Sequence, residues 1–277
     1  MSLNNSLTVP EFKTAIQYER ANQGAMEHRL MQYFLAINSY HSNDPNHTMH
    51  LVRSALHNKQ RFLLQMPLSN LEVDFLCFHG DNNQYTIINS AKPRINEYAF
   101  LCRAFCYTLK LAADGQLSNA RPFFGSQTYT YPENMKNAAF ANMLLLPAPL
   151  FQTMFHQFRS EQQPEDSILS VLARLMNYFK APYHTVLTRC YSLGLLDDGS
   201  VLEHLLQVDS SLIAKEFQRL WLDESLLRPT MQDDFSHFEQ YVKAAGEQYV
   251  EEEYLKLRTL NLALSNMKAS YLSIREG

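Results

Sequence analysis

Apolar residues recur every three or four positions along most of the chain, the spacing that places them on one face of a helix. This pattern predicts helices over residues 8–37, 94–111, 135–146 and 149–159, and two more that meet near Pro182 within residues 168–196. A helix that begins at Pro45, after the capping residue Asp44, is expected to run to about Leu64. Residues 234–274 read as one very long helix in which only Gly246 interrupts the pattern.

The pattern changes to short β-rich runs in one part of the chain. Residues 71–78 and 85–89 are such runs, and Gly80 lies in the polar turn between them. The predicted fold class is therefore α+β and mostly helical, with a small β-sheet packed on a helical core. The expected segments are an N-terminal helical segment (1–66), a core (67–196) and a C-terminal helical segment (197–277).

Composition excludes several classes of protein. Of 277 residues, 46% are hydrophobic and 19% are charged, which is typical of a globular chain. A net charge of −4 gives no electrostatic footprint for nucleic acid, so nucleic acid is not expected as a partner. The first residues lack a secretory signal, and the apolar stretch 138–151 is too short, and too interrupted by Pro147 and Pro149, to span a bilayer. We therefore expect no membrane association. Four cysteines form no disulfide framework, which predicts a reduced, cytoplasmic setting.

The organising element is the helix over residues 94–111. Its apolar stripe consists of Ile95, Ala99, Cys102, Phe105, Cys106 and Leu109, and it contains two of the four cysteines. A free cysteine on such a stripe behaves as a small buried hydrophobic residue.

Three segments resemble the ImmA/IrrE family of zinc metallopeptidase-like proteins. YTIINSAKPRINEYAFLCRAFCYTL (85–109) is similar to that family's strand and R-x-x-F-T-L-A-H-E-L-G-H-Y helix, and ENMKNAAFANMLLLP (133–147) to its E-x-E-A-N-x-F-A-A-x-L-L-M-P helix. ILSVLARLMNYFKAPYHTVLTRCYSLGLL (168–196) is similar to its L-A-x-x-F-x-V-S-x-x-A-x-x-x-R-L-x-x-L-G segment. The resemblance covers residues 71–196 and implies a zincin-like helical core, with family links to repressor cleavage and stress regulation.

The positions that carry the family's chemistry differ. Cys102 and Cys106 occupy the two histidine positions, and Arg103 occupies the position of the glutamate that acts as general base. The third, acidic ligand falls at Asn134 or Lys136. Arginine stays protonated and cannot take a proton, so we expect no catalytic residue and no metal ligand at these five vestigial positions. The resemblance then predicts a catalytically inactive homologue that acts as a regulatory or protein-binding module, without a cofactor.

Three alternatives remain open. In the first, Cys102 and Cys106 bind zinc as thiolates with Cys77 or His79, giving a peptidase with a cysteine-substituted site. In the second, residues 167–196 form a helix-turn-helix that associates with DNA. The third concerns assembly: Leu257, Leu260, Leu264, Met267, Tyr271 and Ile274 follow the seam period of a coiled coil, which predicts either packing on the chain's own core or a homodimer through the C-terminal helix.

Overall fold

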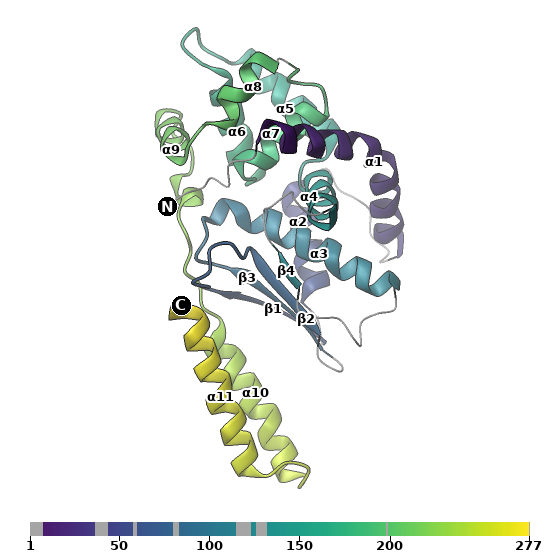
Figure 1. Ribbon diagram of the computed structural model, residues 1–277, viewed down its shortest axis with the longest axis vertical. Coiled ribbons are helices and arrows are strands. Elements are labelled where there is room, and N and C mark those ends of the chain that lie inside the picture. Colours follow the sequence, from purple (N-terminus) through teal and green to yellow (C-terminus); the bar gives the residue numbers. More distant parts are fainter. Residues whose placement is uncertain are drawn as a thin grey trace.

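The protein is mostly helical, with a small mixed β-sheet near its middle, which confirms the predicted α+β class. The computed structural model describes residues 8–36, 44–57, 60–79, 83–114, 123–125, 132–197 and 199–276. Helices α1 to α9 lie on one side of the sheet, and the last two helices project from the other side (Figure 1).

The sheet has the strand order β1-β3-β2-β4. Its strands are β1 (Arg61–Met66), β2 (Phe75–His79), β3 (Gln84–Asn89) and β4 (Phe123–Gly125). Strand β1 is parallel to β3, and the other pairs are antiparallel. The strands expected over 71–78 and 85–89 are confirmed as β2 and β3, although β2 begins only at Phe75. The helix expected to run to Leu64 is wrong, because α2 (Pro45–Leu56) ends early and the following residues form β1.

The helical side of the sheet is built around α3 (Glu97–Asp114), which follows the 3-10 turn η1 (Arg94–Asn96) and packs on β2, β3 and α2. Helix α4 (Pro132–Leu145) packs on α3, and α1 (Val9–Ala36) packs on α4 and α7. The remaining elements are α5 (Ala148–Ser160), α6 (Ile168–Phe179), α7 (Tyr183–Ser192), α8 (Gly199–Leu206), α9 (Ser210–Arg219) and the 3-10 helix η3 (Glu224–Leu227).

One large hydrophobic core unites these helices with the inner face of the sheet. It contains buried residues from Phe12 in α1 to Leu226 in η3, together with Phe75, Cys77 and Ile88 of the strands. The segment boundary expected at 66/67 falls directly after β1, a strand whose partner β3 lies in the predicted core segment. Helices α1 and α2 also contribute buried residues to the same hydrophobic core as α3 to α7. The N-terminal segment is therefore packed into the expected core segment.

The last two helices form an antiparallel hairpin, here called the arm. It consists of α10 (Phe235–Glu251), α11 (Leu257–Glu276) and the turn between them (Figure 1). A single helix over 234–274 is therefore wrong: the chain reverses at residues 252–256, where Glu253 has φ +63°, and Gly246 lies inside α10. A Cβ atom at Gly246 would lie 2.3 Å from Leu260 Cδ1, so glycine allows the two helices to approach closely.

The arm meets the outer face of the sheet only near its base. Phe238 of α10 contacts the rings of Phe62 and Tyr85 edge-on, with centroids 6.4 and 5.7 Å away. At the end of α11, Ile274 O accepts hydrogen bonds from Ser69 N (3.1 Å) and Ser69 Oγ (2.7 Å). A second, smaller hydrophobic cluster fills this junction; its buried members are Met66, Leu68, Phe235 and Tyr271.

Candidate functional site

Cys102 and Cys106, which the proposed resemblance places at two histidine positions, are buried between α3 and its helical neighbours. Cys102 Sγ lies 3.9 Å from Met49 Sδ on α2, and the Cys106 thiol donates to Asn137 Oδ1 at 3.3 Å. Both side chains belong to the main hydrophobic core. They therefore occupy the α3 stripe in the way expected of small buried hydrophobic residues.

Burial also disfavours the deprotonated thiolate form in which cysteine binds a metal. It raises the pKa of the Cys102 thiol far above its usual range, and the neighbouring Cys106 raises it further. Burial likewise raises the pKa of Cys77 to about 12, although its contact with Thr86 opposes this. His79 lies in β2, with its side chain outside the described part of the chain. Among the described residues, no group of three or more His, Cys, Asp or Glu side chains is placed to hold a metal.

Arg103, which the proposed resemblance places at the general-base position, forms a buried ion pair. Its Nη1 donates to Asp74 Oδ2 at 2.6 Å, and Lys92 Nζ bonds the other oxygen of the same carboxylate. Asp74 is completely buried, and the Arg103 guanidinium lies 5.6 Å from the centre of the Phe75 ring. Both oxygens of the Asp74 carboxylate are therefore engaged by cations, so this carboxylate is not free to bind a metal.

The two positions at which the resemblance would place a third ligand lie on α4. Asn134 is part of that helix, with its side chain outside the described residues, and Lys136 is half-buried. The α4 side chain that contacts Cys106 is instead Asn137, whose amide oxygen accepts the hydrogen bond from the thiol. Sequence reasoning missed Asn137 because the motif register pointed to its neighbours. Its position four residues before the buried Ala141 was the available signal.

The pair α6–α7, which has a loose helix-turn-helix pattern, is an internal element. Ser167 caps α6, and Lys180 at φ +50° ends it, so the predicted break near Pro182 is confirmed. Every residue of α7 except His184 is buried, including the polar residues Thr185 and Arg189. A recognition helix must expose such side chains to the major groove, and α7 does not.

Arg189 belongs to a buried polar network that joins three helices. Its Nη1 donates to Glu19 Oε1 on α1 at 2.7 Å, and its Nε donates to Leu146 O at 3.0 Å. Ser192 Oγ donates to Glu19 Oε1 at 2.7 Å, and Asn142 Nδ2 donates to Glu19 Oε2 at 3.0 Å. Both charged side chains are 1% exposed, so the network ties α1 to the core but offers no open reaction centre.

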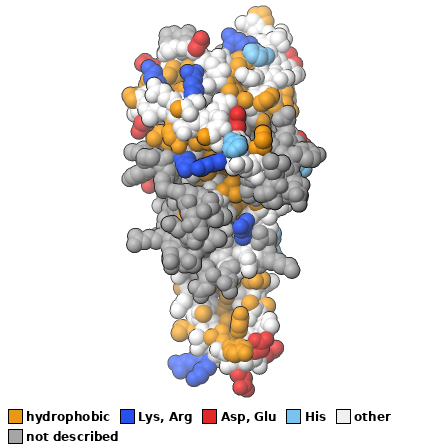
Figure 2. Space-filling model, turned by 90° about the vertical axis from the view of Figure 1, so that its right-hand side faces the viewer, with side chains coloured by type: hydrophobic (Ala, Val, Ile, Leu, Met, Phe, Trp, Pro, Cys, Tyr) orange, Lys and Arg blue, Asp and Glu red, His pale blue; other side chains and the backbone are white. Residues whose placement is uncertain are grey.

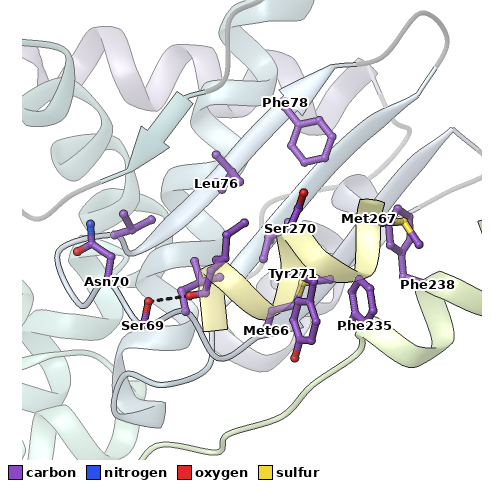
Figure 3. A pocket seen from close by; sticks show the side chains of 14 residues that line it. Met66, Ser69, Asn70, Leu76, Phe78, Phe235, Phe238, Met267, Ser270 and Tyr271 are labelled. Carbon is purple, nitrogen blue, oxygen red and sulfur yellow. Dashed lines mark hydrogen bonds between the residues drawn. The ribbon is translucent and has the colours of Figure 1, made fainter. Parts of the chain in front are cut away.

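An open pocket lies on the other face of the sheet, at the base of the arm. It is a pocket of about 430 Å³ between the outer sides of β2 and β3 and the facing sides of α10 and α11 (Figure 3). Leu76, Phe78 and Ile87 belong to its strand side, and Met267 and Ser270 belong to its α11 side. We refer to it as the arm-base pocket. The sequence did not predict this pocket, because strands β2 and β3 lie almost two hundred residues before helix α11 in the chain.

Two residues that line the arm-base pocket, Phe235 and Tyr271, form a stacked aromatic pair. The Tyr271 ring lies on Phe235 with centroids 3.8 Å apart and planes within 5°. The Tyr271 hydroxyl donates to Asp233, and burial, followed by this interaction, raises the pKa of Tyr271 to about 12. Arg275 lies 3.3 Å from the same carboxylate. The hydroxyl of this pair therefore already has a partner.

Comparison with known proteins adds no family: no protein-family model matches the chain, and no curated protein matches it. Within the described residues, no single helix has both the length and the apolar character to cross a bilayer. The helices over Met135–Leu145 and Ala148–Ser160 reach that level only as a pair, and they are bent by 69° to each other.

Proposed function

We propose that this protein is a catalytically inactive homologue of the ImmA/IrrE metallopeptidases that acts in regulation by binding a protein partner. The observation that carries the proposal is Arg103. The side chain at the general-base position is paired with the buried Asp74, between two buried cysteines at the metal-ligand positions. Hydrolysis by the family mechanism requires a carboxylate and two imidazoles at these positions, so α3 supports packing rather than chemistry.

The arm is the surface we propose for the partner. Beyond its base it projects away from the body, and it carries large apolar side chains that are more than half exposed: Tyr249, Tyr254, Leu257 and Leu262. Figure 2 displays apolar side chains along this part of the molecule, with charged side chains at its end. Tyrosines in an exposed patch with a polar rim are typical anchors of protein interfaces.

The partner is proposed to be a protein rather than nucleic acid. The chain carries a net charge of −4, and the tip of the arm has Glu251 at the end of α10 followed by Glu252 and Glu253 in the turn, which would repel phosphates. All four cysteines are free thiols, which supports a reducing compartment, and we propose the cytoplasm. A second copy of the chain, paired through the arm, is the form of partner that can be tested first.

The test combines substitutions on the arm with a matched control on the body. Tyr249→Ala with Tyr254→Ala removes two exposed rings, and Tyr178→Ala removes a comparably exposed ring of α6. Light scattering first decides whether the partner is a second copy. A photo-crosslinking residue at Tyr249 then identifies a heterologous partner in the native host. We expect loss of the complex in the arm variant and retention in the control.

Equal crosslinking from positions 249 and 178, or a complex unchanged by loss of both arm tyrosines, would refute the arm as the binding surface. Peptide hydrolysis by the purified wild-type chain that stops on Arg103→Ala would refute the inactive-homologue proposal itself.

A further inference from the structure

The arm-base pocket has the size of a ligand site. Its volume of about 430 Å³ lies within the range of roughly 300–1,000 Å³ found for small-molecule sites. The floor is a sheet and the opposite wall is a helix, so both sides are formed by regular secondary structure (Figure 3). Ser270 lines the α11 wall where a larger side chain would fill the space. The cavity thus exists because Ser270 is small, whereas the other residues of α11 that line it are large and mainly apolar.

The lining is free of charge. Among the fourteen lining residues that the structure describes, none is Asp, Glu, Lys, Arg or His. Tyr271 is the one titratable member, and its hydroxyl is engaged by Asp233 outside the pocket lining. A carboxylate or ammonium group that entered would lose its water without gaining a counter-charge, which is costly. The complementary ligand is therefore uncharged.

Two polar residues of the pocket lie at one end, and Ser270 lies on the α11 wall. Ser69 and Asn70 lie together beside the last turn of α11, away from Phe78 and Phe238 (Figure 3). The Ser69 hydroxyl donates to Ile274 O, and Asn70 Oδ1 accepts from Glu72 N, so Ser69 Oγ remains as an acceptor and Asn70 Nδ2 as a donor for a small neutral head such as an alcohol, an amide or an ester. The remaining walls are aliphatic and aromatic, and Met66 and Met267 can adjust their shape to a flexible chain.

The position of the pocket favours a small molecule over a helix of a partner protein. It lies between the sheet and helices α10 and α11, which already occupy the side of the sheet on which a partner helix would pack. Its volume of about 430 Å³ is near the lower end of the range for small-molecule sites.

We propose that the arm-base pocket binds an uncharged, mainly aliphatic small molecule with a small neutral head group. This site is separate from the proposed protein-binding surface, and its occupant would bridge α11 and the sheet at the point where the arm leaves the body. The inference does not depend on the partner proposal, because ligand binding is measured on the purified full chain alone.

The test uses the neutral fluorescent probe N-phenyl-1-naphthylamine and competitors of one chain length. We expect saturable probe binding that 1-dodecanol displaces at a concentration at least tenfold lower than dodecanoate or dodecylammonium at pH 8. Ser270→Phe fills the pocket and should weaken probe binding at least tenfold. Ser265→Phe adds the same ring on an exposed position of α11 and should leave it unchanged.

Several results would overturn the proposal. They are no saturable probe binding by the wild-type chain, equal competition by charged and neutral dodecyl chains, and unchanged binding in Ser270→Phe. Leu76→Phe narrows the same pocket from the sheet side, so it provides an independent variant if Ser270→Phe fails to fold, which circular dichroism detects. Displacement of the probe by an amphipathic helical peptide, with none by dodecanol, would assign the pocket to a protein partner and refute the small-molecule site.

Discussion

The ion pair between Glu19 and Arg189 is fully buried, so the effect of breaking it on the stability of the fold can be predicted. Glu19→Gln keeps the shape of the side chain but removes the charge that neutralises Arg189, which is 1% exposed. Removing one partner of a fully buried pair costs about 3–5 kcal/mol, because the remaining charge is left buried without compensation. Asn142 and Ser192 also lose a charged acceptor, so the cost should lie within that range rather than below it.

Thermal and urea unfolding of the full chain measure this cost. For 277 residues the unfolding entropy is about 0.6 kcal/mol per kelvin, so 3–5 kcal/mol lowers the melting temperature by about 5–9 °C. Glu161→Gln is the matched control, because its pair with Arg174 is 3.4 Å long and partly exposed, and its loss should cost less than about 1 kcal/mol.

A double-mutant cycle distinguishes the pair from simple loss of packing. Glu19→Met combined with Arg189→Met should be less destabilised than the sum of the two single variants by at least about 2 kcal/mol, because the double variant leaves no unpaired charge. Additive effects, or a loss below about 1 kcal/mol for Glu19→Gln, would refute the reasoning that this pair fastens α1 to the core.

Two further predictions concern the arm and pH. Gly246→Leu should destabilise the arm by about 1–3 kcal/mol through overpacking against Leu260, and it should speed tryptic cleavage at Arg258. Ala244→Leu, on the exposed side of α10, is the control and should change neither the stability nor the cleavage rate. Equal cleavage rates in the two variants would contradict the close approach of α10 and α11. The side chain of His184 is half-buried, but its Nδ1 is buried and has no hydrogen-bond partner among the described residues, and this loss of solvation lowers the pKa of His184 to about 4 from its ordinary value near 6.5. His184 is therefore protonated below about pH 6.5 in the unfolded chain but only below about pH 4 in the folded chain. The free energy of unfolding should fall by roughly 2–3 kcal/mol between pH 7 and pH 4. Urea unfolding at pH 7 and pH 4 measures this loss, which should be absent from His184→Gln. An identical pH dependence of stability in the wild-type chain and in His184→Gln would contradict the prediction.

The sequence predicted the elements whose signals are local. The stripe through Cys102 and Cys106 predicted α3, and Asp44 before Pro45 predicted the start of α2, where the Asp44 carboxylate accepts from Asn46 N at 2.9 Å. The strand pair and the break near Pro182 were also predicted, because turn residues and helix caps act over a few positions.

What the sequence did not predict depends on distant partners. Residues 61–66, RFLLQM, have no turn signal before them, and they form β1 because they pair with β3 more than twenty residues later. The reversal of the arm falls at residues 252–256, where Glu, Leu and Lys are good helix formers, so packing rather than local preference sets it. The Asp74–Arg103 pair and the arm-base pocket likewise join segments that no periodicity connects.

Metal content tests the central claim most directly. The full chain should be purified without added metal or chelator and its zinc measured by elemental analysis, beside a Cys102→Ser, Cys106→Ser variant. The account predicts far less than one zinc per chain in both proteins, because both cysteines are buried in the hydrophobic core, burial raises the pKa of Cys102, and no third ligand lies beside them among the described residues. About one zinc per wild-type chain that is lost in the double variant would contradict it.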